Sequence, residues 1–154
     1  PQFIMAYPLA AMLRGLLVGT VVWLISTLFA VLPWESPVLA ISMAILASFL
    51  FAQFGLIAAI YAHNFDTLSM FSNFLILPLV YLGGVFYPIS ILPDPWGKFS
   101  YFNPLFYLID GFRHAIIGVG DTSYLIAFGV SSGIATTLFV WAAWLIGKGY
   151  RLRA

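Results

Sequence analysis

The densest group of ionisable side chains beside an apolar run in this 154-residue chain is Asp110-Gly111-Phe112-Arg113-His114. On a helix, Asp110 would face Arg113 at the third position and His114 at the fourth position further on. Charged groups in apolar surroundings are costly, and they usually face a cavity or a partner. Asp110 and Arg113 either line the mouth of a polar path or form a local ion pair that pins this segment to the following helix. The ion pair is favoured slightly, because we expect Gly111 to end the helix and keep the cluster near water.

The sequence lacks the motifs of nucleotide-binding, metal-binding and nucleophilic sites. Neither lysine, in Gly97-Lys98-Phe99-Ser100 or Gly147-Lys148-Gly149, stands in a phosphate-binding loop, so we expect no nucleotide site. The two histidines are about 50 positions apart and there is no cysteine, so we expect no metal site. Ser131-Ser132-Gly133 has no histidine nearby that could activate a nucleophile. We therefore expect no enzyme activity and no cofactor bound by this chain.

The composition predicts a membrane protein. Hydrophobic residues make up 63% of the chain and charged residues 7%, whereas soluble domains carry about 25% charged residues. The mean hydropathy is +1.05. A net charge of +1 gives no basic surface for nucleic acid. The lipid bilayer is thus the expected surrounding.

Four uncharged runs are long enough to cross a bilayer, and we place the spans at about 14–33, 38–62, 67–89 and 122–147. The segment at about 94–118 differs, because it mixes prolines and polar aromatics with short apolar pieces. Its longest apolar piece, 99–109, has roughly 11 residues, too few to cross. We therefore predict an all-α membrane protein with four transmembrane helices and a re-entrant helical hairpin between the third and fourth.

The third run is interrupted between Leu77 and Pro88, where it contains Pro78 and the pair Gly83-Gly84. A span that served only as an anchor would not need such breaks. Backbone groups freed in lipid must be satisfied by neighbouring protein or by water in a cavity. Broken hydrophobic segments often lie beside a transport path. The sequence therefore predicts part of a membrane transporter.

Four spans put both ends of the chain on one side of the membrane. That side would carry more positive charge than the other, with Arg14, Lys148, Arg151 and Arg153 against Lys98 and Arg113. Positive loops favour the cytoplasm, so we expect a cytoplasmic C-terminus. The chain opens on Pro1 without an initiator methionine, and we interpret it as the C-terminal part of a longer polypeptide.

Small residues recur at helical spacing in two spans, as Gly15 with Gly19 and Gly129 with Gly133. Such pairs let helix backbones approach closely. They would form either a face for a second copy of the chain or, more commonly, packing sites within one copy. Polar groups inside the predicted spans could likewise line a route or hydrogen-bond between helices, and they are Gln53, Asn73 and Tyr81.

Several short motifs resemble, in order and spacing, the permease subunits of type-2 ABC exporters. They are Leu77 to Pro88, Leu92-Pro93, Asn103-Pro104-Leu105-Phe106-Tyr107 and Asp110-Gly111-Phe112-Arg113, preceded by Arg14-Gly15 at the start of a span. The likeness covers essentially the whole chain. It is strongest to a bacterial branch with nodulation-factor exporters and uncharacterised permeases.

The resemblance implies a six-span permease of the inner (plasma) membrane, of which this chain holds the last four spans. Two short helices between Asp94 and Asp121 would re-enter from the outer face. Two permeases would pair as a homodimer, and separate ATP-binding cassette subunits would bind ATP and Mg²⁺ on the cytoplasmic side. The loop His63 to Asp66 would lie near that ATPase. The substrate would be lipid-like, a glycan or hydrophobic.

The implied mechanism is a rocking motion of two permeases, driven by ATP, that opens the path between them outward. An apolar outer gate would form from aromatic residues near the hairpin, namely Phe86, Tyr87, Tyr101 and Phe106. The same aromatics could instead anchor the hairpin at the membrane interface.

Three other functional classes fit the sequence less well. An ion-coupled secondary transporter would need carboxylates in mid-span and a structural repeat, whereas every Asp and Glu here lies at a predicted span end or in the hairpin. A membrane scaffold without transport would not need the broken third span. A membrane enzyme would need a convergent nucleophile, base or metal set, which the sequence lacks.

Overall fold

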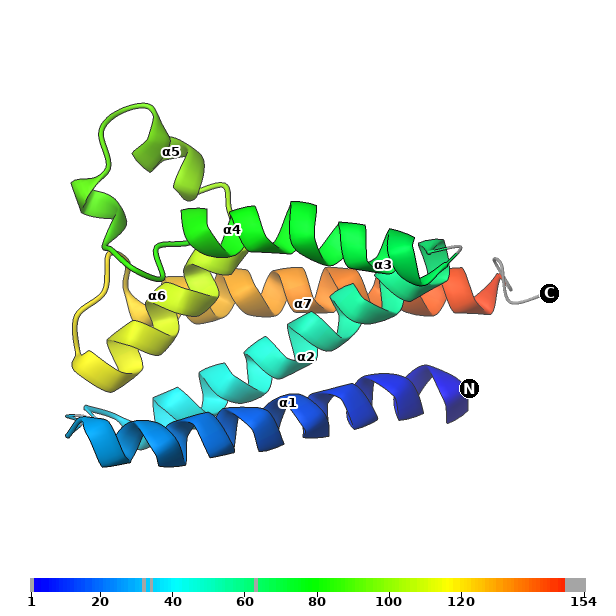
Figure 1. Cartoon of the computed structure of the whole chain (residues 1–154), viewed down its shortest axis with the longest axis horizontal. Coiled ribbons are helices and arrows are strands. Elements are labelled where there is room, and N and C mark those ends of the chain that lie inside the picture. The colour runs from blue at the N-terminus through cyan, green and yellow to red at the C-terminus, as the bar shows by residue number, and fades with distance from the viewer. Residues whose placement is uncertain (1, 32, 34, 63, 149–154) are drawn as a thin grey trace.

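The computed structural model of the chain describes residues 2–31, 33, 35–62 and 64–148. Within these ranges every regular element is helical (Figure 1). The elements are α1 (Gln2–Phe29), α2 (Pro37–Tyr61), α3 (Phe65–Phe71), the π-helix η1 (Ser72–Ile76), α4 (Leu77–Leu82), the 3-10 helix η2 (Ile89–Ile91), α5 (Trp96–Ser100), α6 (Pro104–Ile117) and α7 (Tyr124–Gly147). Of the predicted positions, Pro1, His63, Arg151 and Arg153 lie outside the described residues.

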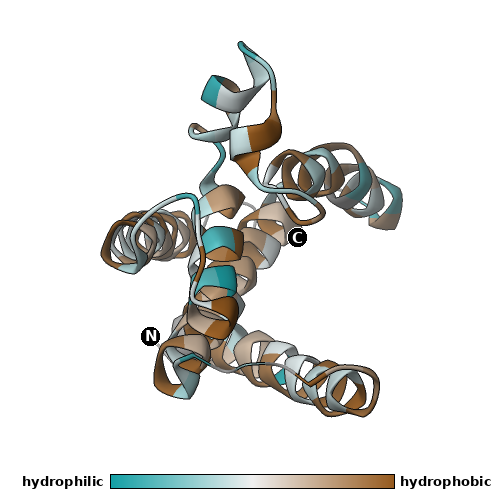
Figure 2. Ribbon diagram, turned by 90° about the vertical axis from the view of Figure 1, so that its left-hand side faces the viewer, coloured by the Kyte–Doolittle hydropathy of each residue, from teal (hydrophilic) through white to brown (hydrophobic). Residues whose placement is uncertain are grey.

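Among the described residues, four stretches are long and apolar enough to cross a membrane: Ala6–Phe29, Pro37–Tyr61, Phe65–Leu82 and Tyr124–Gly147. The predicted all-α membrane fold with four spans is thus confirmed. The start of α1 and the end of α7 lie at the same end of the bundle (Figure 1). Viewed from the opposite end, hydrophilic residues gather in the short helices and connections, while the long helices are largely apolar (Figure 2).

Two spans have limits that differ from those expected. Helix α1 begins at Gln2, so the exposed Arg14 lies within the first span and not at its start. The residues before Arg14 are mostly apolar and continue the helix, and a long arginine side chain can extend toward the membrane surface. The third span ends at Leu82 and does not reach 89, because the helical backbone stops at Gly83.

The core lies where α2, α6 and α7 meet. Its buried residues come from all three helices and include Met43, Leu50, Leu105, Leu108, Ala135 and Leu138. Helix α1 packs on α2, outside this core. The third span contacts α2 and α6, and none of its 18-residue window is buried.

Gly111 occupies the crossing point of α6 with its neighbours. The expectation that Gly111 ends a helix is wrong, since α6 continues to Ile117 and closes at Gly118. A Cβ atom added at Gly111 would lie 2.5 Å from Met43 Cε and 3.0 Å from Ala127 Cβ. The missing side chain therefore serves close packing of α6 against α2 and α7, and the helix does not break there.

This packing gives a stability prediction for Gly111→Ala. The added methyl group meets Ala127 and the end of Met43, so we expect a loss of about 1–3 kcal/mol in the free energy of unfolding. Gly55→Ala is the matched control, because nothing lies within 4 Å of a Cβ at Gly55. The measurement is the thermal midpoint of the full-length protein in detergent. Equal midpoints for the two variants would contradict the role of Gly111 in close packing of α6 against α2 and α7.

Candidate functional site at the broken end of the third span

The break in the third span has three successive parts. The π-helix η1 precedes α4, where Pro78 has no N–H to donate to the preceding turn. Helix α4 ends at Gly83, where an added Cβ would lie 2.7 Å from Ile109 Cδ1. Gly84 has a φ of 80°, a left-handed conformation that favours glycine. Of the predicted break residues, Pro78 therefore lies in the first turn of α4, directly after the π-helix, and Gly83 and Gly84 lie where the helix ends and the chain turns.

Three side chains bind backbone carbonyl groups at this break. Asn103 Nδ2 donates to the Leu79 carbonyl at 2.5 Å. The Arg113 guanidinium donates to the Gly84 carbonyl. The Tyr87 hydroxyl donates to the carbonyl of Tyr81 at 3.3 Å. An unsatisfied carbonyl within a membrane would be costly, so these three donors make the break tolerable.

Arg113 also pairs with Asp121, which lies in the connection between α6 and α7. The Arg113 Nη1–Asp121 Oδ2 distance is 3.5 Å, and the two side chains are 21% and 9% exposed. The same Asp121 oxygen accepts the Ile89 N–H at 3.0 Å. One carboxylate thus joins α6, the start of η2 and the residues that lead into the fourth span.

Asp110 is fully buried, and it also binds the connection between α6 and α7. Its carboxylate accepts the Asp121 N–H at 2.7 Å, the Thr122 N–H at 2.8 Å and the Thr122 hydroxyl at 2.6 Å. The local pairing expected between Asp110 and Arg113 is therefore wrong. The N–H groups in the loop before α7 need hydrogen-bond acceptors, and the Asp110 carboxylate accepts from them. Arg113 pairs with the Asp121 carboxylate instead. Both carboxylates nonetheless attach α6 to the start of the fourth span. We call Asn103, Asp110, Arg113, Asp121 and Thr122 the polar cluster.

Of the four aromatic residues predicted as an outer gate, Phe86 contacts the ring of Tyr81, Tyr101 contacts that of Phe106, and the Tyr87 hydroxyl binds the Tyr81 carbonyl. Phe86 stacks on Tyr81 with 5.6 Å between ring centroids, and Tyr101 meets the edge of Phe106 at 5.3 Å. Phe86 is 72% exposed and Tyr101 43%, whereas Phe106 is 1% exposed. Phe106 therefore supports Tyr101 from the core, and the exposed rings are those of Phe86 and Tyr101. The gate itself stays a prediction.

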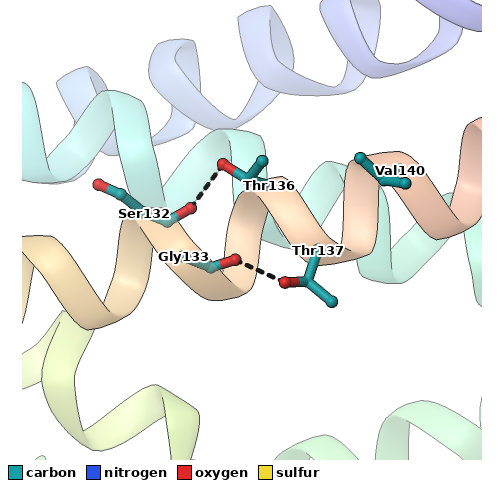
Figure 3. Close-up of a pocket in the computed structure, with 5 residues that line it drawn as sticks. All are labelled: Ser132, Gly133, Thr136, Thr137 and Val140. Carbon is teal, nitrogen blue, oxygen red and sulfur yellow. Dashed lines mark hydrogen bonds between the residues drawn. The ribbon is translucent and has the colours of Figure 1, made fainter.

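The small-residue pairs have different surroundings. A Cβ at Gly15 would lie 3.1 Å from Ser48 Oγ, so Gly15 packs α1 on α2. In the part of the chain that the structure describes, no atom lies within 4 Å of a Cβ added at Gly19, Gly129 or Gly133. Gly133 lines an open groove on α7 with Ser132, Thr136, Thr137 and Val140, and the two threonine hydroxyls donate to carbonyls of their own helix (Figure 3). Contact of this face with a second copy stays a prediction.

Sequence reasoning did not identify Asn103 and Asp121 as members of the site. Asn103 precedes Pro104 at the start of α6, an order typical of a helix N-terminus, and its Oδ1 caps Leu105 N at 3.0 Å. Asp121 stands just before the fourth span, among small polar residues. Helical spacing alone cannot relate these two residues to the third span, because they approach it only in the folded chain.

The ion pair of the polar cluster, Arg113–Asp121, should cost more stability to break than the exposed pair Lys98–Asp94. Arg113→Met removes the donor to the Gly84 carbonyl and the partner of Asp121, so we expect a loss of about 1.5–3 kcal/mol in the free energy of unfolding. Lys98→Met breaks a pair with Asp94 whose side chains are 76% and 72% exposed, and should change stability by less than about 1 kcal/mol. The measurement is the thermal midpoint of each variant in detergent. Similar midpoints would show that the Arg113 contacts contribute little.

Comparison with known proteins agrees with this architecture. The profile of the ABC-2 type transporter family matches residues 1–117. The inner membrane transport permease YadH of Escherichia coli strain K12 is 37% identical over 140 residues, which cover 90% of this chain and 55% of the relative. Nodulation protein J of Sinorhizobium fredii is 29% identical over 104 residues, covering 68% of this chain and 40% of the relative. The same protein of Bradyrhizobium diazoefficiens is 24% identical over 107 residues, covering 70% and 41%.

The chain spans about half the length of the curated relatives it matches. No solved structure shows a significant match to it. The family profile covers the first three spans, the break in the third span and α6 up to Ile117. This chain therefore belongs to the ABC-2 type transporter family.

Proposed function

We propose that the chain is the membrane-spanning permease part of an ATP-binding cassette exporter. It would form the translocation path for a lipid-like, glycan or hydrophobic substrate, while a separate subunit binds ATP and Mg²⁺ and hydrolyses the nucleotide. The match of the ABC-2 type transporter family to residues 1–117 carries this proposal. The permease YadH and nodulation protein J, both similar over most of the chain, support it.

In the proposed mechanism, the polar cluster would hold three segments of the permease together during transport. Arg113 and Asp121 connect the outer end of the third span to the start of α7, and Asp110 fixes the loop between α6 and α7. These segments would move as one body when ATP-driven closure rocks two permeases. The exposed rings of Phe86 and Tyr101 would then move with this body and close or open the outer gate.

The assembly in this proposal is a homodimer in the bacterial inner membrane, with each permease engaging one ATP-binding cassette subunit. The name of the YadH relative supports the inner membrane. The C-terminus would face the cytoplasm, where Lys148 follows α7. Placing the start of α1 and the end of α7 at one end of the bundle is consistent with this orientation.

Ion-coupled transport is the main alternative, and the geometry of the carboxylates argues against it. A coupling site needs a carboxylate with free oxygens facing the path. Both Asp110 oxygens accept hydrogen bonds from the loop before α7. Asp121 binds Arg113 and the Ile89 N–H. These two groups are thus engaged in holding the fold.

Affinity capture of the full-length permease from mildly solubilised membranes tests the proposed function. We expect a stoichiometric partner chain with a phosphate-binding loop, whose ATPase rate changes when the permease is present. An unrelated six-span membrane protein purified in the same detergent is the control. A folded permease that reproducibly retains no ATPase would contradict the exporter and favour ion-coupled transport or a scaffold.

A further inference from the structure

Gln53, in the second half of α2, is a fully buried polar side chain. Neither its Oε1 nor its Nε2 has a hydrogen-bond partner among the described residues. A hydrogen bond to another helix, one of the two roles expected of Gln53, is therefore not made within that part of the chain. An amide without a partner in an apolar interior is strongly unfavourable. A further group must bind this amide.

A second buried group of this kind, the Ser131 hydroxyl, belongs to α7. Ser131 is fully buried, and its Oγ likewise has no hydrogen-bond partner in the described ranges. The adjacent Ser132 instead donates to the Phe128 carbonyl of its own helix at 2.7 Å, an arrangement open to serines in helices. The lack of a partner at Ser131 is thus specific to the buried face of α7.

Helical spacing places both side chains in the core between α2 and α7. Gln53 follows Leu50 by three residues and precedes Ile57 by four, and both of these residues belong to that core. Ser131 precedes Ala135, another core residue, by four positions. The amide and the hydroxyl therefore enter one core from two facing helices.

Gln53 and Ser131 also lie at similar depths. Helices α2 and α7 begin at the same end of the bundle (Figure 1), where Ser42 Oγ lies 2.6 Å from the Tyr124 hydroxyl. Gln53 is eleven residues beyond Ser42 and Ser131 seven beyond Tyr124, so at roughly 1.5 Å per residue their levels differ by about 6 Å. Helical side chains lean toward the start of their helix, and this brings the long Gln53 side chain closer to the level of Ser131. One small ligand can therefore reach both groups.

We propose that Gln53 and Ser131 bind a buried water molecule between α2 and α7. Lipid, cargo or a second copy cannot reach these fully buried groups while the bundle is intact. A metal cation would bind the oxygen atoms but leave the Gln53 Nε2 donors without an acceptor. Water both donates and accepts, and buried waters typically bind polar groups that have no other partner. The site goes beyond the proposed function, because it requires no ATP-binding subunit.

Magnetisation transfer from water, measured by solid-state NMR on the full-length permease in lipid bilayers, tests this site. The signal is that of the Gln53 side-chain amide, which is identified by its loss in Gln53→Met. The backbone amide of Gly55 is the control, since Gly55 lies on the same helix and nothing described lies within 4 Å of a Cβ added there. We expect transfer to the Gln53 amide to be several-fold faster than transfer to Gly55.

Ser131→Ala removes the second ligand of the water, so we expect transfer to the Gln53 amide to fall several-fold. Ser132→Ala is the matched control and should leave the transfer unchanged, because the Ser132 hydroxyl binds its own helix. Transfer to Gln53 no faster than to Gly55 would overturn the inference, as would unchanged transfer in Ser131→Ala. The comparison of Gln53 with Gly55 uses the unaltered sequence, so it does not depend on the folding of a variant.

Discussion

A backbone carbonyl or N–H group within a bilayer has no water to bind, and the structure depends on how this constraint is met at one place. The third span stops at Gly83, and the chain then turns at Gly84. Asn103 binds the Leu79 carbonyl, and Arg113 binds the carbonyl of Gly84. The break therefore requires that α6 lie beside the end of α4, and the two helices are in contact.

Burial decides how much each charged contact contributes to stability. The exposed Lys98–Asp94 pair is worth about 0–1 kcal/mol, as surface pairs generally are. Hydrogen bonds to charged groups away from water contribute about 1.5–3 kcal/mol each. Asp110 makes three such contacts with the loop before α7 while fully buried. The cluster thus unites the broken end of the third span, α6 and the start of α7.

Composition and run length were enough to predict an all-α membrane fold, four spans and the break at Pro78 and Gly83. The partners of Asp110 could not be predicted, because helical spacing relates residues on one helix and the Asp110 acceptors bind a loop eleven residues further on. Gly111 was misassigned for a similar reason. Glycine ends helices when exposed, but here it admits Met43 and Ala127 to the α6 backbone. The resemblance to type-2 ABC permeases rested on the order and spacing of several motifs, because each motif alone is too short to be specific.

Hydrogen–deuterium exchange of the full-length permease in lipid nanodiscs tests most directly whether the polar cluster holds the broken span. The amides of Ile89, Asp121 and Thr122 lie outside α4, α6 and α7, yet each donates to a carboxylate of the cluster. We expect these three amides to exchange as slowly as amides within the neighbouring helices, because exposing them to water requires separation of α6 from the connection before α7. Exchange at the rate of unstructured loops would contradict this expectation, and the break would then be satisfied by water and not by the protein.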